Sequence, residues 1–189
     1  MKSISELVQT AHQNAIDKGW WEEPRTYGEL IALVHSEVSE ALEDYRAGRK
    51  PAQVWYEKKG AIGAQSANEQ IDADWKPCGI PSELADICIR IFDIAGHYGF
   101  GQELQQACES KEPNWQVVEP FPFADNLAVI HLNLSESFAA TETMVRSLAD
   151  ALLNTESLAK FYGIDLDRAI AEKMSYNATR PQRHGGKVL

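Results

Sequence analysis

Two pairs of carboxylates, each with its members three residues apart, are the residues of this sequence best suited to do chemistry. The pairs are Glu37 with Glu40 and Glu83 with Asp86. Residues three apart share one face of a helix, and both pairs lie in apolar stretches, where unpaired acids are costly. Few histidines accompany them, so the pattern predicts an all-oxygen site for a hard divalent cation, Mg²⁺ or Mn²⁺.

Four acids from two antiparallel helices could hold more than one ion. Such a site neutralises phosphoryl oxygens and lowers the pKa of a bound water. A redox di-iron site is disfavoured, because neither pair is followed by the Glu-x-x-His motif of those bundles. The alternative is that the acids lie on solvated faces and pair with Lys or Arg.

A second candidate set lies near the C-terminus. Lys173, Asn177 and Arg180 follow one another at steps of four and three, which places them on one helix face. Two cations and an amide suit phosphate oxygens, and Arg can bind them through two hydrogen bonds. The alternative is a solvated basic helix end favoured by the helix dipole. Further donors follow in the tail: Arg183, His184 and Lys187.

Several aromatic residues could contact a planar ligand. Trp20, Trp21 and Tyr176 could stack on a nucleobase, although packing in the core is the commoner role of a Trp. His35 lies two residues before Glu37 and suits a position at the edge of the core as well as it suits a ligand.

Composition bounds the class of protein. The chain has 189 residues, a formal net charge of −10 and 44% hydrophobic residues, which is typical of a globular domain. The acidic balance argues against binding a nucleic acid polymer. No apolar run approaches the ~20 residues that span a bilayer, and the polar N-terminus does not resemble a signal peptide. Three cysteines without metal-ligand spacing favour a reducing cytoplasm and no disulfide framework.

The elements that must position these residues are predicted to be helices, because apolar residues recur at three- and four-residue steps and no useful alternation appears. The chain is therefore predicted to be all-α. Thr26 with Glu29 indicates a capping box, and Ser82 is predicted to be an N-cap. Residues 49–80 are predicted to be a long loop with at most a short helix. The predicted helices span Ile4 to Gly19, Tyr27 to Ala47, Ser82 to about Gly99, Glu103 to Lys111, Asp125 to Ala140, Thr143 to Phe161 and Leu166 to Ala178, with a linker at Pro113, Pro120 and Pro122.

An internal repeat is suggested by self-comparison. Residues 32–42 align with 128–138, which matches His35 to His131, and residues 83–86 align with 147–150. Asp86 precedes Gly99 by 13 residues, and Asp150 precedes Gly163 by 13. The alternative is that bundle helices are commonly rich in Leu, Ala and Glu, so that weak sequence matches between them arise by chance.

The repeat predicts a single-chain pseudo-dimer with one metal site. The second copy replaces the Glu37 and Glu83 equivalents by Asn133 and Ser147, so only the first copy keeps all four acids. The expected halves are residues 1–118, which bind the metal, and residues 119–189, a degenerate repeat with the phosphate-binding helix. Together they would form one composite domain.

These residues resemble motifs of the MazG-like, all-α nucleoside triphosphate pyrophosphohydrolases, a superfamily that includes the dimeric dUTPases. The matching motifs are His35-Ser-Glu37-Val-Ser-Glu40, Lys76-Pro, Gly79-Ile-Pro-Ser-Glu83-Leu-Ala-Asp86, Glu172-Lys173-Met-Ser-Tyr-Asn177-Ala-Thr-Arg180-Pro and His184-Gly-Gly-Lys187. The resemblance implies Mg²⁺-dependent hydrolysis of a (d)NTP to the monophosphate and pyrophosphate, with water attacking the α-phosphate. It also implies that the four acids bind metal and take part in catalysis, and that Lys173, Asn177 and Arg180 bind phosphate. A homodimer is left open.

The chain departs from the compact pattern of this superfamily. In short relatives, the helix with Glu-x-x-Asp leads almost directly to the Lys…Asn…Arg helix, whereas residues 100–162 intervene here. We therefore expect the two halves to complement each other in one composite site. Two other functions remain open: a catalytically weakened metal-binding interaction module, and a phosphohydrolase that acts on a non-nucleotide substrate.

Overall fold

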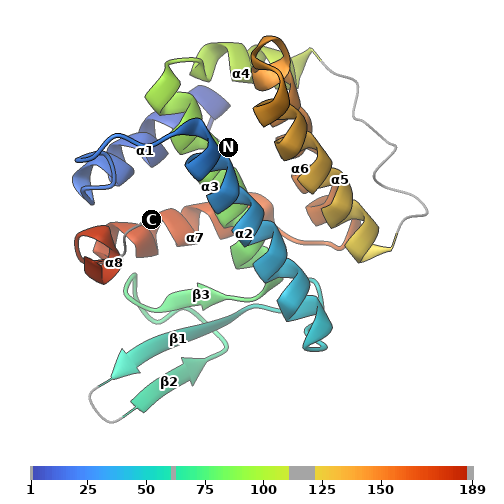
Figure 1. The fold of residues 1–189 in the computed structure, drawn as a ribbon. Coiled ribbons are helices and arrows are strands. Elements are labelled where there is room, and N and C mark those ends of the chain that lie inside the picture. Colours follow the sequence, from blue (N-terminus) through green and yellow to red (C-terminus); the bar gives the residue numbers. More distant parts are fainter. Residues whose placement is uncertain (1, 61–62, 111–121, 187–189) are drawn as a thin grey trace.

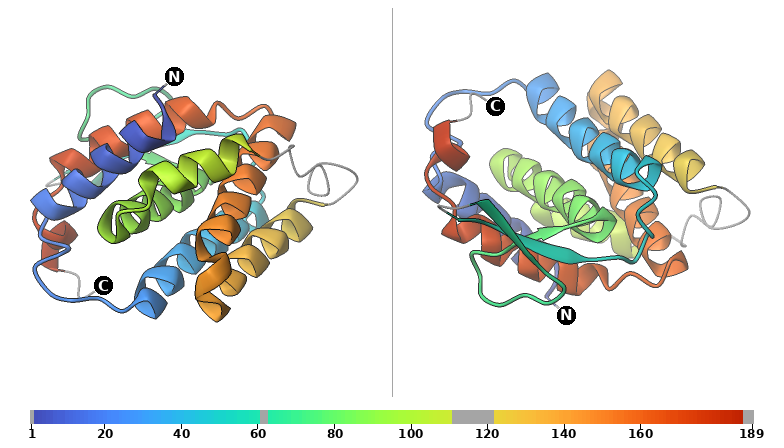
Figure 2. Two further views of the ribbon diagram at one scale, coloured as in Figure 1. Left: turned by 90° about the horizontal axis from the view of Figure 1, so that it is seen from above. Right: turned by 90° about the horizontal axis from the view of Figure 1, so that it is seen from below.

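The computed structural model describes residues 2–60, 63–110 and 122–186, and this part of the chain is mostly helical (Figures 1 and 2). The helical class expected from the periodicity is confirmed. No helix of the described part is long and apolar enough to cross a membrane. The helices are α1 (Ile4–Asp17), α2 (Tyr27–Arg46), α3 (Ile80–Tyr98), α4 (Gly101–Glu109), α5 (Phe123–Ala139), the 3-10 turn η2 (Thr141–Thr143), α6 (Met144–Phe161), α7 (Leu166–Thr179) and α8 (Arg183–Gly186).

Local capping sets where the first two helices begin. The capping box predicted for α2 is present: Glu29 N donates to Thr26 Oγ1 at 3.2 Å, and Thr26 N donates to Glu29 Oε2 at 2.7 Å. A second capping box, between Ser3 and Glu6, opens α1. Each box satisfies backbone donors that a helix start leaves unpaired.

The prediction that residues 49–80 form a loop is wrong. Strands β1 (Trp55–Gly60), β2 (Gly63–Ala67) and β3 (Lys76–Cys78) form an antiparallel sheet in the order β2-β1-β3. The strands are short and contain several Lys and Gly residues, so their sequence carries little apolar–polar alternation. Tyr56 anchors the sheet, because its ring is 2% exposed and its hydroxyl donates to Glu172 Oε2 on α7 at 2.7 Å.

The predicted N-cap of α3 is also wrong. The helix begins at Ile80 after Gly79, whose φ of +100° favours glycine, and Pro81 lies in its first turn. Ser82 instead uses its hydroxyl for tertiary contacts. It donates to Pro77 O at 2.8 Å and accepts from Lys173 Nζ at 2.6 Å. A hydroxyl two residues inside the helix therefore joins α3 to the strand before it and to α7.

Replacing Gly79 by Ala is expected to destabilise the protein by about 2 kcal/mol or more. An added Cβ would lie 2.5 Å from Gln53 O and 2.9 Å from Trp55 Cζ3, in a backbone conformation that side chains rarely adopt. Gly48→Ala is the control, because it has a similar φ of +81° with open space around it. The control should cost only about 1 kcal/mol. Equal losses for the two variants in urea unfolding would contradict the close approach at Gly79.

Helix α3 lies at the centre of the bundle and packs against α1, α2, α6 and α7 (Figure 2). Its side chains Leu84, Ile87 and Ile91 are fully buried, as their helical spacing predicts. The three cysteines are buried and form no disulfide in the described part of the chain. The expected linker residues Pro113 and Pro120, and the expected helix end at Lys111, lie outside the described residues.

The helix pair α5–α6 packs beside α2 and α3. At the contact of α2 with α5, His35 Nδ1 lies 2.6 Å from His131 Nδ1 and the two rings stack. Between α5 and α6, Asn154 Nδ2 donates to Asn133 Oδ1 at 2.7 Å. Polar contacts therefore join all three helices within a largely apolar interface.

Candidate functional site

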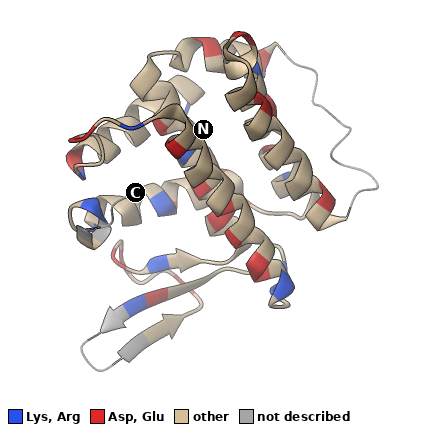
Figure 3. Ribbon diagram, viewed as in Figure 1, with Lys and Arg blue, Asp and Glu red and all other residues tan. Residues whose placement is uncertain are grey.

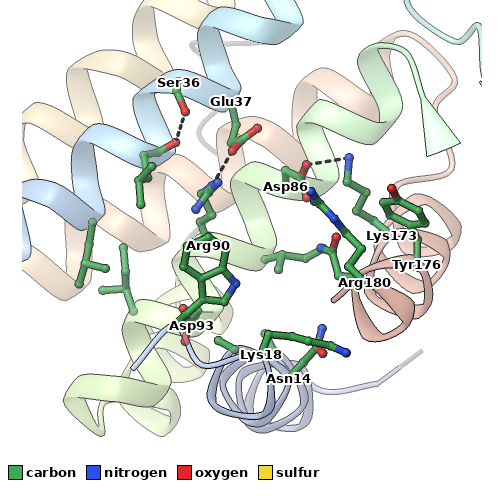
Figure 4. Close-up of a pocket in the computed structure, with 18 of the residues that line it drawn as sticks. Asn14, Lys18, Ser36, Glu37, Asp86, Arg90, Asp93, Lys173, Tyr176 and Arg180 are labelled. Atoms are coloured by element: carbon green, nitrogen blue, oxygen red, sulfur yellow. Dashed lines mark hydrogen bonds and ion pairs between the residues drawn. The ribbon is translucent and has the colours of Figure 1, made fainter. Parts of the chain in front are cut away.

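Ten of the residues singled out from the sequence line one cavity of about 530 Å³, bounded by α1, α2, α3, α7 and the edge of the sheet (Figure 4). Acidic residues gather along α2, and basic residues lie on α7, β3 and α8 (Figure 3). The ten residues are Trp20, Trp21, Glu37, Glu40, Glu83, Asp86, Lys173, Tyr176, Asn177 and Arg180. Residues from opposite ends of the sequence thus share one cavity.

Three of the four predicted acids form a close group. Glu37, Glu83 and Asp86 each offer a carboxylate oxygen, and these oxygens lie within 4.8 Å of one another. The i, i+3 spacing puts the last two on one face of α3, and the packing of α2 brings Glu37 against them. Glu40 lines the same cavity but is exposed, and it lies outside this group.

Two cations hold the acid group in place. Lys173 Nζ lies 2.7 Å from Asp86 Oδ2, and Arg90 Nε donates to Glu37 Oε1 at 2.6 Å (Figure 4). Glu83 makes no direct ion pair within the described residues. Three buried or half-buried carboxylates therefore have two close cationic partners, and the group retains negative charge when all three are ionised.

Burial controls the protonation of this cluster. It raises the pKa of Glu83 to about 7, although Lys173 opposes the shift, and it raises the pKa of Glu37 against the opposing charge of Arg90. Burial lowers the pKa of Lys173, but Asp86 and Glu83 outweigh that effect and leave the pKa above its ordinary value. Lys173 thus stays charged near Glu83 and Glu37, the two acids of the group whose pKa values burial raises.

The donor set fits a hard divalent cation. All three close ligands are carboxylate oxygens, which Mg²⁺ and Mn²⁺ prefer. The ion pairs occupy Glu37 Oε1 and Asp86 Oδ2, so the second oxygen of each carboxylate remains for a metal. The arrangement therefore suits an ion held by α2 and α3.

Mg²⁺ binding at pH 7 is expected to release roughly half a proton, because Glu83 must lose the proton that it carries near its pKa. Without metal, the raised pKa stabilises the folded protein fully below pH 4.5, and this contribution is lost as pH rises through about 7. Calorimetric titration in buffers of different ionisation enthalpy measures the release. At pH 8.5 the release should fall close to zero, and a release independent of pH would contradict the assignment.

The predicted phosphate-binding residues play different parts. Lys173 is 3% exposed and is engaged by Asp86 and Ser82, so it neutralises the acids. Asn177 Oδ1 is buried without a hydrogen-bond partner among the described residues, which is unusual unless a ligand supplies one. Arg180 is half-buried and its guanidinium lies 5.6 Å from the centre of the Tyr176 ring. Burial lowers the pKa of Arg180.

The aromatic residues are already packed on one side. Trp21 stacks on His97 with ring centres 3.7 Å apart, and its Nε1 donates to Asp93 Oδ1 at 2.9 Å. The Arg25 guanidinium lies 5.6 Å from the Trp20 ring centre. The role of these two Trp residues in stacking on a base stays a prediction.

Other lining residues were not singled out from the sequence. They are Asn14, Lys18, Glu57, Lys76, Arg90 and Asp93. Arg90 follows Asp86 by four residues and could have been found from this spacing on the helix. Lys76, on β3, belongs to the Lys76-Pro motif of the resemblance but was given no role from the sequence, and Glu57, on β1, gave no signal.

No protein-family model, no curated protein and no solved structure matches this chain. The inference of function therefore depends on the residues and geometry of the cavity.

Proposed function

We propose that the chain is a Mg²⁺-dependent nucleoside triphosphate pyrophosphohydrolase that converts a (d)NTP and water to the (d)NMP and pyrophosphate. One observation carries the proposal: the carboxylates of α2 and α3 share a cavity with Asn177 and Arg180 at the end of α7. A carboxylate group beside phosphate-binding donors is the combination that a metal-bridged polyanion requires.

Each residue has a definite part in this proposal. Glu37, Glu83 and Asp86 would hold the cation, and Glu40 extends the acidic face of α2 towards solvent. Bound there, Mg²⁺ neutralises phosphate oxygens and lowers the pKa of a coordinated water. Lys173 keeps Asp86 in position through its 2.7 Å ion pair.

The remaining groups would act on the triphosphate. Arg180 can donate two hydrogen bonds to phosphate oxygens, and Asn177 can present either its oxygen or its amide group into the cavity. A carboxylate with a pKa near 7, such as Glu83, can exchange a proton at neutral pH. The chain thus has groups to bind the phosphates and to move a proton.

We also propose that the fold is a MazG-like bundle built as a single-chain pseudo-dimer. His35 and His131 occupy equivalent positions in the two repeats and contact each other, which is what a two-fold relation between the repeats would produce. Helices α3 and α6 are each followed by a glycine in the left-handed region, Gly99 at φ +75° and Gly163 at φ +69°. The contact between His35 and His131 and the equivalent glycines after α3 and α6 support the duplication.

The repeat also explains why one metal site is proposed. The pair of Glu37 with Arg90 in the first copy corresponds in register to the pair of Asn133 with Asn154 in the second. A neutral hydrogen bond replaces an ion pair at the equivalent place, so the second copy keeps the contact between helices without the charge that binds a cation.

The test is to incubate purified protein and Mg²⁺ with a panel of NTPs and dNTPs and to measure pyrophosphate. Release of pyrophosphate that EDTA abolishes and that falls strongly in Arg180→Ala would support the proposal. Release of orthophosphate alone would indicate another phosphohydrolase. No turnover by folded protein across the panel would favour the metal-binding interaction module.

A further inference from the structure

The end of the cavity away from the acid group carries a second set of polar residues. Asn14 and Lys18 from α1 and Asp93 from α3 line this end, and in Figure 4 Arg180 lies between Asp86 and the two residues of α1. None of the three contacts the carboxylate cluster. We call Asn14, Lys18 and Asp93 the distal set.

Asp93 presents a fixed hydrogen-bond acceptor. Its Oδ1 accepts from Trp21 Nε1 at 2.9 Å and lies 2.7 Å from His12 Nδ1. Trp21 is in turn held by stacking on His97. The carboxylate is 21% exposed, and its Oδ2 has no donor in the described part of the chain. An immobilised acceptor therefore faces the cavity.

Lys18 and Asn14 supply donors at the same end of the cavity (Figure 4). They are four residues apart, on one face of α1. The Lys18 ammonium makes no ion pair, and the Asn14 carboxamide makes no hydrogen bond, with any residue that the structure describes. Apolar residues also line the cavity: Ala11, Ala15, Leu30, Leu33, Ile89 and Ile94. Apolar walls with a few converging polar groups are typical of a site for a flat organic ligand.

We propose that the distal set binds the base of the nucleoside triphosphate and selects bases that carry an exocyclic amino group, an inference that rests on the proposed function. Ionised Asp93 can only accept and Lys18 can only donate. Cytosine and adenine present an amino donor beside a ring-nitrogen acceptor, which matches this pair. Replacing the amino group by an oxo group would set an acceptor against Asp93 Oδ2, and neither oxygen would then have a donor.

The test compares nucleotides that differ at this group, CTP with UTP and ATP with ITP. For the wild-type protein, kcat/KM is expected to favour the amino member of each pair by about tenfold or more. In Asp93→Asn the ratio should fall below one. Trp21 Nε1–H can only donate, so the new amide oxygen must stay at the Oδ1 position and its NH₂ group must replace Oδ2. The acceptor facing the cavity becomes a donor.

Two further variants keep the test specific. Lys18→Met removes the donor and should lower kcat/KM for both members of a pair without inverting their ratio. Asp17→Asn makes the same charge change as Asp93→Asn at an exposed position of α1 outside this cavity, and it should change neither value. If Asp93→Asn does not fold, the proposal is tested by two other results. These are the ratio of kcat/KM values for the wild-type protein and the loss of kcat/KM in Lys18→Met.

The outcomes separate the two proposals. Hydrolysis at equal rates for both members of each pair, or an unchanged ratio in Asp93→Asn, would overturn the base-selection proposal and leave the pyrophosphohydrolase in place. If no triphosphate is hydrolysed, the proposed function fails, and calorimetric binding of the α,β-imido analogues of CTP and UTP still tests the site. Equal binding of the two analogues, or none, would overturn the proposal. Tighter binding of the CTP analogue would support it.

Discussion

Glu83→Gln is expected to reduce Mg²⁺-dependent hydrolysis at least about a hundredfold, since even residues outside the ligand shell typically change metal affinity or activity 10- to 100-fold. The same change should stabilise the metal-free protein. Burial raises the pKa of Glu83 to about 7, so above that pH the folded protein holds a carboxylate at a cost, and Gln removes the charge. The gain should approach about 3 kcal/mol near pH 8 and fall below about 1 kcal/mol near pH 5.

Activity and stability should therefore change in opposite directions in this variant. Pyrophosphate release measures the first, and urea unfolding at pH 5 and pH 8 measures the second. Glu43→Gln on α2 is the control, because Glu43 pairs with Arg46 at the surface and lies outside the cavity. The control should leave both quantities nearly unchanged. Retained hydrolysis in Glu83→Gln would remove the carboxylate cluster from the mechanism.

Lys173→Met is expected to cause the largest loss of stability, about 3–5 kcal/mol at neutral pH, which is typical when one partner of a buried ion pair is removed. The ammonium is 3% exposed and is the cation nearest to Asp86, with Glu83 beside it. Without it, three carboxylates would share a small volume with Arg90 as the nearest cation. The loss should shrink as pH falls, because protonation removes the repulsion, and it should shrink on addition of Mg²⁺.

Arg168→Met on the same helix is the matched control. Arg168 pairs with Glu172 at 2.7 Å, but its side chain is 66% exposed, so the loss should stay below about 1 kcal/mol. Urea unfolding of both variants across pH, with and without Mg²⁺, gives the comparison. Equal losses, or a loss in Lys173→Met that neither acid nor Mg²⁺ relieves, would show that Lys173 stabilises by packing and not by neutralising the acids.

The helices could be read from the sequence because their causes are local. The Thr26–Glu29 box and the spacing of Leu84, Ile87 and Ile91 act within a few residues, and both predictions are confirmed. The sheet could not be read in the same way. Its strands are held by pairing between β1 and its two neighbours and by Tyr56 docking on Glu172, which are contacts between distant segments.

Ser82 is a second case in which a contact with a distant segment could not be predicted from the local sequence. Pro-Ser before an apolar run is typical of a helix start, yet the hydroxyl serves Pro77 and Lys173. The competing partner comes from α7, which no pattern near Ser82 reveals. Arg90 and Asp93 lie on α3, but only the packing of α2 and of the loop before it shows what they bind.

For the carboxylate cluster, spacing along the chain sufficed to place Glu83 and Asp86 on one helix face, because the geometry of a helix is set by its own backbone. The spacing likewise placed Lys173 and Asn177 on one face of α7, whereas Arg180, predicted to share that face, is the extended residue that follows the helix and still lines the cavity. Tertiary structure decided which acids meet, that Glu40 stays apart from them, and that Lys173 neutralises Asp86. These outcomes depend on how α2 and α7 pack against α3, and packing is determined by side chains from the whole chain.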